Sequence, residues 1–415
     1  MSPRRPSSLC SRLRIEAGPE VGQPAPAPDG PPPPFGLYLH LPFCRRKCAY
    51  CDFASAPLEA LGGLPFAARY LRALAVELDL RAASDEFWGA PVETIYLGGG
   101  TPTVLPSEWL ADLLTRARRL FPVAGDCEVT VEANPGTVNN ASLEALFAAG
   151  VNRLSLGVQS LDDAVLRTLR RAHDAAQAEA AAQAARAAGC RNLSVDLIYG
   201  VPGQSLESWR QTLSRALALG PEHISCYPLS LEPGTPLAEG VATGRLAEPD
   251  EDLCADMFTL AARLLTEAGY CHYEISNLAR PGWECRHNRR YWGNDEYLGV
   301  GASAHSFRGG VRWNNAGDPR VYTGWLERGL LPVVRAEALS PRGRLGEMLM
   351  LGLRRAEGVC EQELAACCGI APREAFGREI ERLCAEGLLV AGEGWLRIPR
   401  EHWLVSNEVL QEFAG

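Results

Sequence analysis

Short apolar runs alternate with longer stretches of helical periodicity from residue 36 to about residue 268. Each apolar run ends in glycine or polar residues, and a stretch with apolar residues three and four positions apart follows it. The six strands expected from this pattern cover residues 36–40, 93–97, 127–133, 152–157, 192–199 and 223–229. The expected helices cover residues 66–83, 107–120, 140–149, 162–171, 175–188, 205–219 and 250–268. This alternation predicts an α/β protein with a parallel sheet, either an open doubly wound sheet or a full or partial (β/α) barrel.

In both architectures, ligands bind at the carboxyl ends of the parallel strands. Glycine-rich or polar segments stand at four of these ends, at residues 98–102, 132–135, 157–160 and 196–203. The carboxyl ends of parallel strands lie along one edge of the sheet. The sequence therefore predicts that these four segments outline a single cleft.

The last 75 or so residues follow a different pattern. Three short helices are expected at 340–355, 360–367 and 372–387, a hairpin from 388–390 and 395–398, and a final helix at 404–413. Three helices and a hairpin are typical of a winged-helix module. Because this segment is rich in glutamate, we do not expect it to bind DNA.

Composition limits the remaining function classes. The chain has a net charge of −9 and no run of about 18 apolar residues, so we expect neither nucleic-acid binding nor a membrane span. Residues 1–34 are rich in arginine and serine and then in proline, which is typical of a disordered leader, with a transit peptide as the alternative. They contain no secretory hydrophobic segment, and we expect a cytoplasmic protein.

The candidate chemistry begins with a dense group of three cysteines. Cys44, Cys48 and Cys51 form a C-x3-C-x2-C pattern in the loop after the first strand. Three thiolates on so short a loop can hold three irons of a [4Fe–4S] cube and leave the fourth iron open to a substrate. The basic run 45–47 is expected to lower the pKa of these thiols. The alternative is a structural zinc ion, for which His40 is the nearest fourth ligand.

Several motifs together resemble the radical SAM superfamily, in which three cysteines bind such a cluster and S-adenosylmethionine (SAM) chelates the open iron. Within it, the chain is most similar to the oxygen-independent coproporphyrinogen oxidase group, and more closely to the haem chaperone branch of that group. The matching phrases lie at residues 38–44, 98–102, 131–135, 157–160, 171–173, 196–200 and 406–410. The resemblance implies a partial (β/α)6 barrel over about residues 35–230, which further strands and helices extend to form a core over residues 35–335. With the element pattern, we expect a small winged-helix-like domain over residues 336–415.

The resemblance also assigns roles to individual residues. It implies that Cys44, Cys48 and Cys51 ligate the cluster and that Phe53 lies near the adenine of SAM. The residues that match contacts to the cluster-bound SAM are Tyr38, Gly99, Gly100 and Glu132. Those that match the second SAM of the oxidase are Gln159, Arg171 and Asp196.

Two departures from the sequence pattern of the oxidase favour the chaperone branch. The oxidase has a further cysteine two residues after its third cluster cysteine, where this chain has Phe53. Residues 287–292 fit the H-N-x-x-Y-W phrase of the chaperone branch, which implies that His287 contacts haem. The alternative interpretation is that His287 is hydrogen-bonded to its neighbours, with the two aromatic residues in the core. Cys285 and His305 are alternative axial ligands.

The leading hypothesis is a haem chaperone that binds a [4Fe–4S] cluster, SAM and haem and delivers haem to acceptor haemoproteins. It implies an electron donor for the cluster and peripheral membrane association during haem delivery. The enzyme hypothesis is an oxygen-independent coproporphyrinogen III dehydrogenase, which would carry out oxidative decarboxylation in porphyrin biosynthesis with 5′-deoxyadenosyl radicals. A third hypothesis is a zinc-stabilised binding protein.

Overall fold

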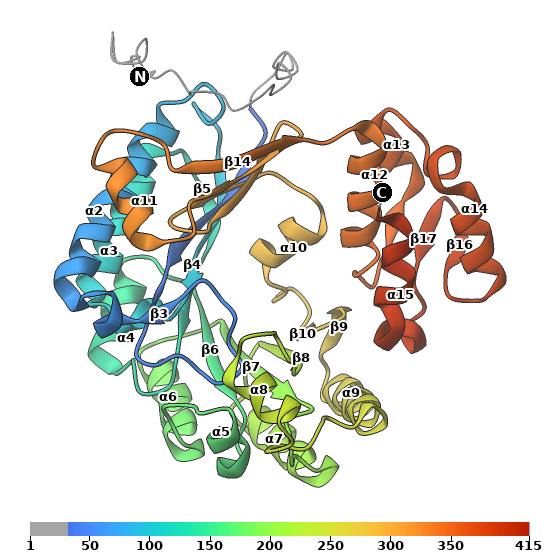
Figure 1. Cartoon of the computed structure of the whole chain (residues 1–415), viewed down its shortest axis with the longest axis horizontal. Coiled ribbons are helices and arrows are strands. Elements are labelled where there is room, and N and C mark those ends of the chain that lie inside the picture. Colours follow the sequence, from blue (N-terminus) through green and yellow to red (C-terminus); the bar gives the residue numbers. More distant parts are fainter. Residues whose placement is uncertain (1–31, 415) are drawn as a thin grey trace.

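The computed structural model describes residues 32–414, in which a curved, twelve-stranded sheet has helices on its outer side (Figure 1). Six neighbouring parallel strands form its centre, and they are the six strands predicted from the sequence. They are β1 (Phe35–Leu41), β4 (Val92–Gly99), β5 (Val123–Ala133), β6 (Arg153–Gln159), β7 (Leu193–Tyr199) and β8 (His223–Pro228). Residues 1–31, most of the expected leader, lie outside the described residues.

The sheet continues beyond this centre on both sides. Next to β1 it adds β11 (Tyr297–Val300), which is parallel to β1, and then the antiparallel strands β12 (His305–Arg308), β13 (Val311–Asn315) and β14 (Val333–Ala338). Next to β8 it adds β10 (Asn277–Ala279) and β9 (Cys271–Glu274), both in antiparallel pairings. A short parallel pair, β2 (Phe43–Cys44) and β3 (Ala56–Pro57), lies in the cysteine loop.

Within residues 32–414, seven helices lie on the outer side of the sheet (Figure 1) and begin close to the predicted positions. They are α2 (Gly63–Ala82), α3 (Ser107–Leu120), α4 (Asn140–Ala148), α5 (Asp163–Thr168), α6 (Ala175–Ala187), α7 (Leu206–Ala218) and α9 (Glu251–Glu267). The helices α1 (Leu58–Leu61), α8 (Pro236–Ala242) and α11 (Pro319–Leu326) were not predicted. Side-chain caps fix several starts: Asp174 forms a capping box with Gln177, and Asp162 accepts from the backbone N–H of Ala164. Helix α5 ends earlier than predicted, and the left-handed Arg170 follows it.

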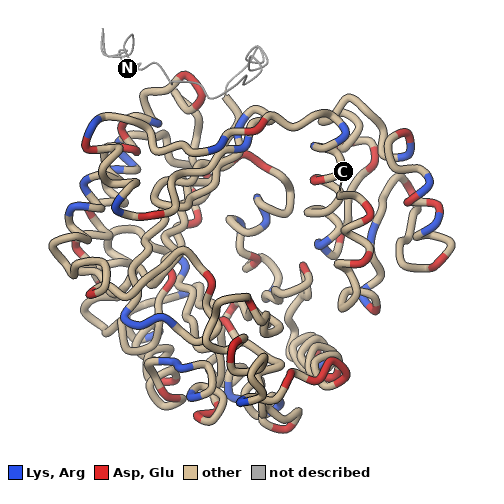
Figure 2. Tube along the Cα trace, viewed as in Figure 1, with Lys and Arg blue, Asp and Glu red and all other residues tan. Residues whose placement is uncertain are grey.

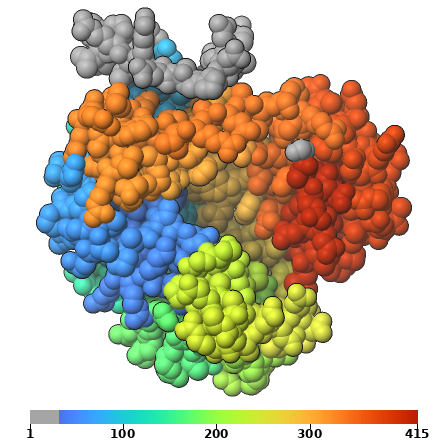
Figure 3. Space-filling model, viewed as in Figure 1, coloured from blue at the N-terminus to red at the C-terminus, as the bar shows by residue number. Residues whose placement is uncertain are grey.

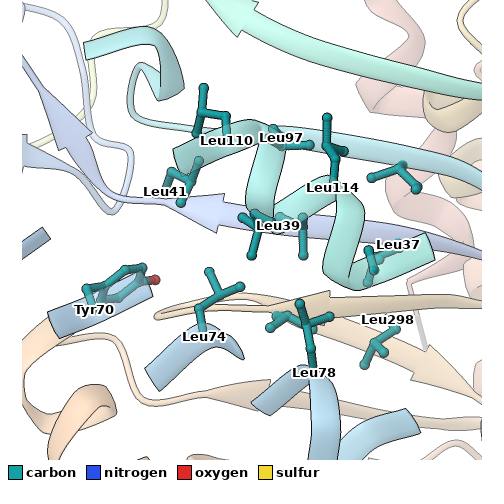
Figure 4. Close-up of a cluster of buried hydrophobic side chains, with 14 of the residues drawn as sticks. Leu37, Leu39, Leu41, Tyr70, Leu74, Leu78, Leu97, Leu110, Leu114 and Leu298 are labelled. Carbon is teal, nitrogen blue, oxygen red and sulfur yellow. The ribbon is translucent and has the colours of Figure 1, made fainter. Parts of the chain in front are cut away.

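The main core lies between β1 and the helices that cover it (Figure 4). Leu37, Leu39 and Leu41 alternate along β1 and are fully buried. They face residues spaced three or four apart on α2 and α3, as an amphipathic helix requires. These partners are Tyr70, Leu74, Leu78, Leu110 and Leu114. This packing fixes β1, and with it the loop that carries the three cysteines.

The C-terminal segment has a core of its own and lies beside the barrel, in orange-red and red at the right of Figure 3. It consists of α12 (Pro341–Gly352), β15 (Val359–Cys360), α13 (Glu361–Cys368), α14 (Pro372–Ala385), β16 (Val390–Gly392), β17 (Trp395–Arg397) and α15 (Ser406–Leu410). The predicted hairpin is β16 and β17, and β15 adds a third strand that was not predicted. Shorter 3-10 turns flank α15 where one long helix was expected.

Positions of Lys and Arg alternate with positions of Asp and Glu along the trace of both parts (Figure 2). Nucleic-acid-binding proteins typically concentrate Lys and Arg instead. No helix among residues 32–414 is long and apolar enough to cross a membrane.

A fully buried carboxylate joins four segments of the chain. Glu77 on α2 accepts hydrogen bonds from the backbone N–H of Gly301 at 3.0 Å, from the Tyr322 hydroxyl at 2.6 Å and from Asn315 Nδ2 at 2.8 Å. Arg81, one turn along α2, lies 3.7 Å from it. Burial raises the pKa of Glu77, and these partners oppose that shift. The hydrogen bonds of Glu77 therefore tie α2 to α11, to β13 and to the loop after β11.

We expect Glu77→Ala to lower the free energy of unfolding by about 3–5 kcal/mol, because it leaves the Arg81 guanidinium buried without its counter-charge. Urea unfolding followed by circular dichroism measures this loss. Glu327→Ala is the matched control, since it removes an exposed ion pair to Arg69 that also joins α2 to the end of α11. Its loss should be much smaller. Equal losses from the two variants would contradict a special role for Glu77.

Candidate functional site

A cavity of about 500 Å³ opens at the carboxyl ends of the parallel strands. Its walls come from the cysteine loop and from four strand ends, so the predicted cleft exists. The expected site residues that line it are Cys44, Cys48, Cys51, Phe53, Gly99, Gly100, Glu132, Gln159, Arg171 and Asp196. The structure thus brings together residues that are up to 152 positions apart in the sequence. Tyr38 and His287 are not in this lining.

The basic run inside the cysteine loop holds the loop in place. Arg45 Nη1 donates to the backbone carbonyl of Gly136 at 3.4 Å, and Arg46 Nη2 donates to that of Arg171 at 2.6 Å. Lys47 Nζ donates to two carbonyls within its own loop, at 3.3 and 3.2 Å. Each cation therefore binds a backbone oxygen, and together they fix the loop against the segment after β5 and the segment after α5.

The expectation that this basic run lowers the thiol pKa values is wrong for two of the three cysteines. Burial raises the pKa of Cys44 and of Cys51, and the charge of Lys47 offsets only part of the shift at Cys51. The side chain that contacts a thiol is instead Arg171, whose Nη1 lies 3.2 Å from Cys48 Sγ. Its Nη2 also donates to the carbonyl of Gly157 at 2.7 Å, which links the cysteine loop to the end of β6.

His40 is committed to the loop and cannot act as a free ligand. Its Nε2 donates to the carbonyl of Ala54 at 2.9 Å, so that Nδ1 accepts from the Tyr38 hydroxyl at 3.1 Å. Among the described residues, no group of three or more His, Cys, Asp and Glu side chains is arranged to hold a single metal ion. These contacts weigh against the zinc alternative. They also place Tyr38 beneath the cysteine loop and not in the wall of the cavity.

The glycine run after β4 is required by close packing against the cysteine loop. A Cβ atom on Gly100 would lie 2.5 Å from the carbonyl oxygen of Phe43, and one on Gly99 would lie 2.4 Å from the ring of His40. Gly99 also has a φ of +106°, which disfavours any residue with a side chain. Its N–H donates to Glu132 at 3.1 Å. The glycines therefore let the loop and the end of β4 touch, and one of their N–H groups orients the Glu132 carboxylate.

Two partly buried carboxylates in the cavity wall, Glu132 on β5 and Asp196 on β7, lie on either side of β6. Glu132 accepts from the Tyr96 hydroxyl at 2.8 Å, and Asp196 accepts from Ser155 at 2.9 Å and from Ser225 at 2.8 Å. Burial, and then the charge of Asp196, raise the pKa of Glu132 to about 7. Burial also raises the pKa of Asp196. The pair can therefore hold a proton or bind a cationic or hydroxyl-bearing ligand near neutral pH.

His287 lies on a short helix, α10 (Arg286–Trp292), which crosses the inner face of the sheet at β4. Its Nδ1 is hydrogen-bonded to Thr94 at 2.8 Å and its Nε2 to the Tyr291 hydroxyl at 3.0 Å. Its ring stacks on Tyr96 with centroids 5.0 Å apart, and burial lowers its pKa to about 3. These contacts match the alternative interpretation, a histidine bonded to its neighbours. The haem contact stays a prediction, and iron ligation would require one of these hydrogen bonds to break.

The start of α10 is held by a carboxylate from β5. Glu128 accepts from the backbone N–H groups of Arg286 at 3.1 Å and of His287 at 3.0 Å, and the Cys285 thiol also points to it at 3.6 Å. Asn288, the next residue of the helix, lines the cavity. Helix α10 therefore closes the inner end of the cavity. Of the two alternative axial ligands, Cys285 is fully buried and His305 is exposed.

Sequence reasoning missed several lining residues, among them Tyr96, Arg153, Ser225 and Asn288. A signal for them was present, because polar residues occupy alternate positions of otherwise apolar strands. Arg153, Ser155 and Gly157 alternate on β6 with leucine and valine residues that pack against the helices. Side chains at alternate positions face opposite sides of a sheet, so this set must point into the barrel.

Two family profiles match different parts of this chain. Residues 38–216 match the profile of the Radical SAM superfamily, and residues 339–405 match that of the HemN C-terminal domain. The chain is 42% identical over 386 residues to the protein named heme chaperone HemW of Mycobacterium tuberculosis, across 93% of this chain and 96% of that protein. It is 35% identical over 388 residues to heme chaperone HemW of Escherichia coli K12, across 92% of this chain and 99% of that protein.

A solved structure is similar over nearly the same length. It is that of coproporphyrinogen III oxidase (HemN) from Escherichia coli, which is described as a radical SAM enzyme. The TM-score is 0.79 at 25% identity, and the match covers 93% of this chain and 91% of that one. The predicted fold class, a partial (β/α)6 radical SAM barrel with a small C-terminal domain, is confirmed.

The raised pKa of Glu132 predicts a change of stability with pH. Its carboxyl has a pKa of about 7 in the folded protein against an ordinary 4.5, so the folded state binds more protons between these values. The wild type should therefore lose stability relative to Glu132→Gln as the pH rises from 5 to 8, on the order of 3 kcal/mol. Urea unfolding of both proteins at several pH values measures the difference.

An Asp196→Asn background provides the control for this prediction. The Asp196 charge is one cause of the raised pKa of Glu132. In the Asp196→Asn background, Glu132→Gln should therefore change the pH dependence of the unfolding free energy by less than it does in the wild type. A stability difference that does not change with pH would show that Glu132 ionises normally.

Proposed function

This chain belongs to the HemW family of the radical SAM superfamily, and from that premise we propose that it is a haem chaperone. In this proposal it holds a [4Fe–4S] cluster and SAM, binds haem and delivers it to acceptor haemoproteins. The observation that carries the proposal is that the three loop cysteines and the two partly buried carboxylates line one cavity at the strand ends.

The three loop cysteines fit a cluster better than a single ion. Cys44, Cys48 and Cys51 are free thiols, each partly exposed, in the wall of one cavity. Their arrangement is not that of ligands around one metal ion, whereas the corners of a cube hold its thiolates apart. When bound, such a cluster supplies single electrons to a ligand on its open iron. Arg171 would donate to the sulfur of Cys48 and offset part of the cluster's negative charge.

The cavity also fits SAM, whose sulfonium and amino groups are cationic. Glu132 would accept from the amino group, in a position set by the Tyr96 hydroxyl and the Gly99 N–H. Phe53, which is 66% exposed at the mouth, is free to cover the adenine. Asp196 and Gln159 lie on neighbouring strands and would bind ribose hydroxyls or a second SAM.

Haem binding is proposed from the relatives, which bear the name heme chaperone HemW. Helix α10 supports it, because His287, Asn288 and Tyr291 of this helix lie at the inner end of the cavity or beside it. A second candidate function is the oxidation of coproporphyrinogen III, the activity for which the protein of the similar solved structure is named. Phe53 stands where the oxidase group has a further cysteine, and this departure favours the chaperone.

The proposed partners follow from this function. Haem must pass to acceptor haemoproteins, at times beside a membrane, and the cluster needs an electron donor. The cysteines among residues 32–414 are free, and thiols persist in a reducing compartment, which supports a cytoplasmic location.

The cluster proposal predicts that each loop cysteine is required. After anaerobic reconstitution, the wild type should show the visible absorption and, once reduced, the paramagnetic resonance of a four-iron cluster. Cys44→Ala, Cys48→Ala and Cys51→Ala should each lose these signals, because a missing thiolate leaves two irons without a protein ligand. Cys271→Ala, at an exposed free thiol on β9, is the control and should keep them. Zinc without iron in the anaerobic preparation would contradict the proposal.

The haem proposal predicts saturable haem uptake and no turnover of coproporphyrinogen III by the reconstituted protein. If His287 contacts haem, His287→Ala should weaken uptake about tenfold or more in an absorbance titration. His305→Ala is the comparison, since His305 is exposed.

The outcomes separate the candidate functions and the candidate ligands. Product formation from coproporphyrinogen III would support the oxidase instead of the chaperone. A loss of uptake in His305→Ala alone would move the haem contact to β12, and unchanged uptake in both variants would remove both histidines from the haem site.

A further inference from the structure

One buried cation of the barrel interior has no partner within the described residues. Arg153, at the start of β6, is only 2% exposed. Its Nε is buried without a hydrogen-bond partner, and no carboxylate of residues 32–414 lies within 4.0 Å of its guanidinium. An unpaired buried charge is costly unless a ligand supplies the counter-charge.

The neighbouring groups do not neutralise Arg153. Burial lowers the pKa of Arg153, but the groups around it, the Glu128 carboxylate among them, raise that pKa by more, so the guanidinium remains charged. The nearby Glu128 carboxylate already accepts from the first two N–H groups of α10. Glu132 and Asp196 are bonded to hydroxyl groups instead.

The position of Arg153 places it deeper than the carboxylates. It pairs in register with Thr130, and Ser155, two residues further along β6, pairs with Glu132. Two residues of a strand span about 6.6 Å, so Arg153 lies one step further from the cysteine loop. It nevertheless lines the cavity, together with Ser225 and Asn288. The Arg153 guanidinium therefore lies at the inner end of the cavity, away from the cysteine loop.

We propose that Arg153 is the anchor of a carboxylate-binding subsite at the inner end of the cavity. A guanidinium can hold a carboxylate through two parallel hydrogen bonds, and Ser225 and Asn288 supply further polar groups beside it. Haem carries carboxylates on its propionates, and a second SAM would carry one on its methionyl group, whereas the first SAM uses that group on the open iron of the cluster. The inference thus rests on the proposed function and adds the residue that recognises the acid group.

Ligand pairs that differ only in the carboxylate test this subsite. The full-length protein, reconstituted anaerobically, is titrated with haem and haem dimethyl ester, and separately with SAM and decarboxylated SAM. The wild type should prefer the free acid in one of these pairs by roughly ten- to hundredfold. A preference in the haem pair indicates that the subsite takes a propionate. In the SAM pair the open iron also favours the carboxylate, so only the part of the preference that Arg153→Met removes indicates a second SAM in the subsite. This comparison uses the native chain, so it does not depend on a variant that folds.

Arg153→Met should abolish the preference that the subsite causes, and Arg153→Lys should keep part of it. The Met variant also removes the attraction between the guanidinium and Glu128, and the melting temperature of the ligand-free protein measures the contribution of that attraction to stability. Arg81→Met is the matched control: Arg81 is also buried, but it lies outside the cavity and pairs with Glu77. It should lower the melting temperature and leave both ligand preferences intact.

The remaining outcomes separate the subsite from the proposed function. Equal binding of acid and ester forms by the wild type, or preferences that persist in full in Arg153→Met, would overturn the subsite and leave the proposed function standing. A lower melting temperature of Arg153→Met with unchanged preferences would make Arg153 a structural partner of Glu128. A wild type that takes up neither haem nor SAM would overturn the proposed function and the subsite together.

Discussion

Polar side chains inside the barrel are shielded from water and therefore need hydrogen-bond or ion-pair partners within the protein. This constraint determines how the residues of the site are arranged. The outward faces of the strands are apolar and pack against helices, whereas the inward faces carry Glu128, Glu132, Arg153 and Asp196. A buried charge is tolerated only where hydrogen bonds or an opposite charge replace its water. The carboxylates find such partners in hydroxyl groups and backbone N–H groups, and these bonds fix their positions.

The same constraint explains how α10 is held at the inner end of the barrel. Glu128 has both oxygens occupied by the first turn of α10, so the helix start and the buried carboxylate stabilise each other. His287 continues the connection to β4 through Thr94. The outer side of α10 faces the C-terminal domain, where Arg354 lies over the Trp292 ring at 4.9 Å. The helix is therefore in contact with the cavity and with the second domain at once.

The cysteine loop is positioned by backbone contacts more than by its thiols. The basic run 45–47 binds carbonyl oxygens, and Gly99 and Gly100 allow β4 to approach the loop at distances that no Cβ atom would permit. Lys and Arg side chains are long enough to reach oxygens in neighbouring segments, so one short run can join several of them. A loop fixed in this way keeps its three sulfurs in the cavity wall before any ligand arrives.

The sequence alone determined the six parallel strands, the helices between them and the four strand ends that form the cleft, because periodicity and glycine placement are local and strand ends meet at one edge. It also determined the cysteine motif and, through resemblance, the superfamily. Only the tertiary structure decided that the basic run binds carbonyls, that both His287 nitrogens are occupied and that Arg153 lies unpaired inside the barrel. Whether a charge is paired, and whether a pKa rises or falls, depends on burial and on atoms brought close by folding. Residues far apart along the chain supply those atoms, and no local pattern encodes their distances.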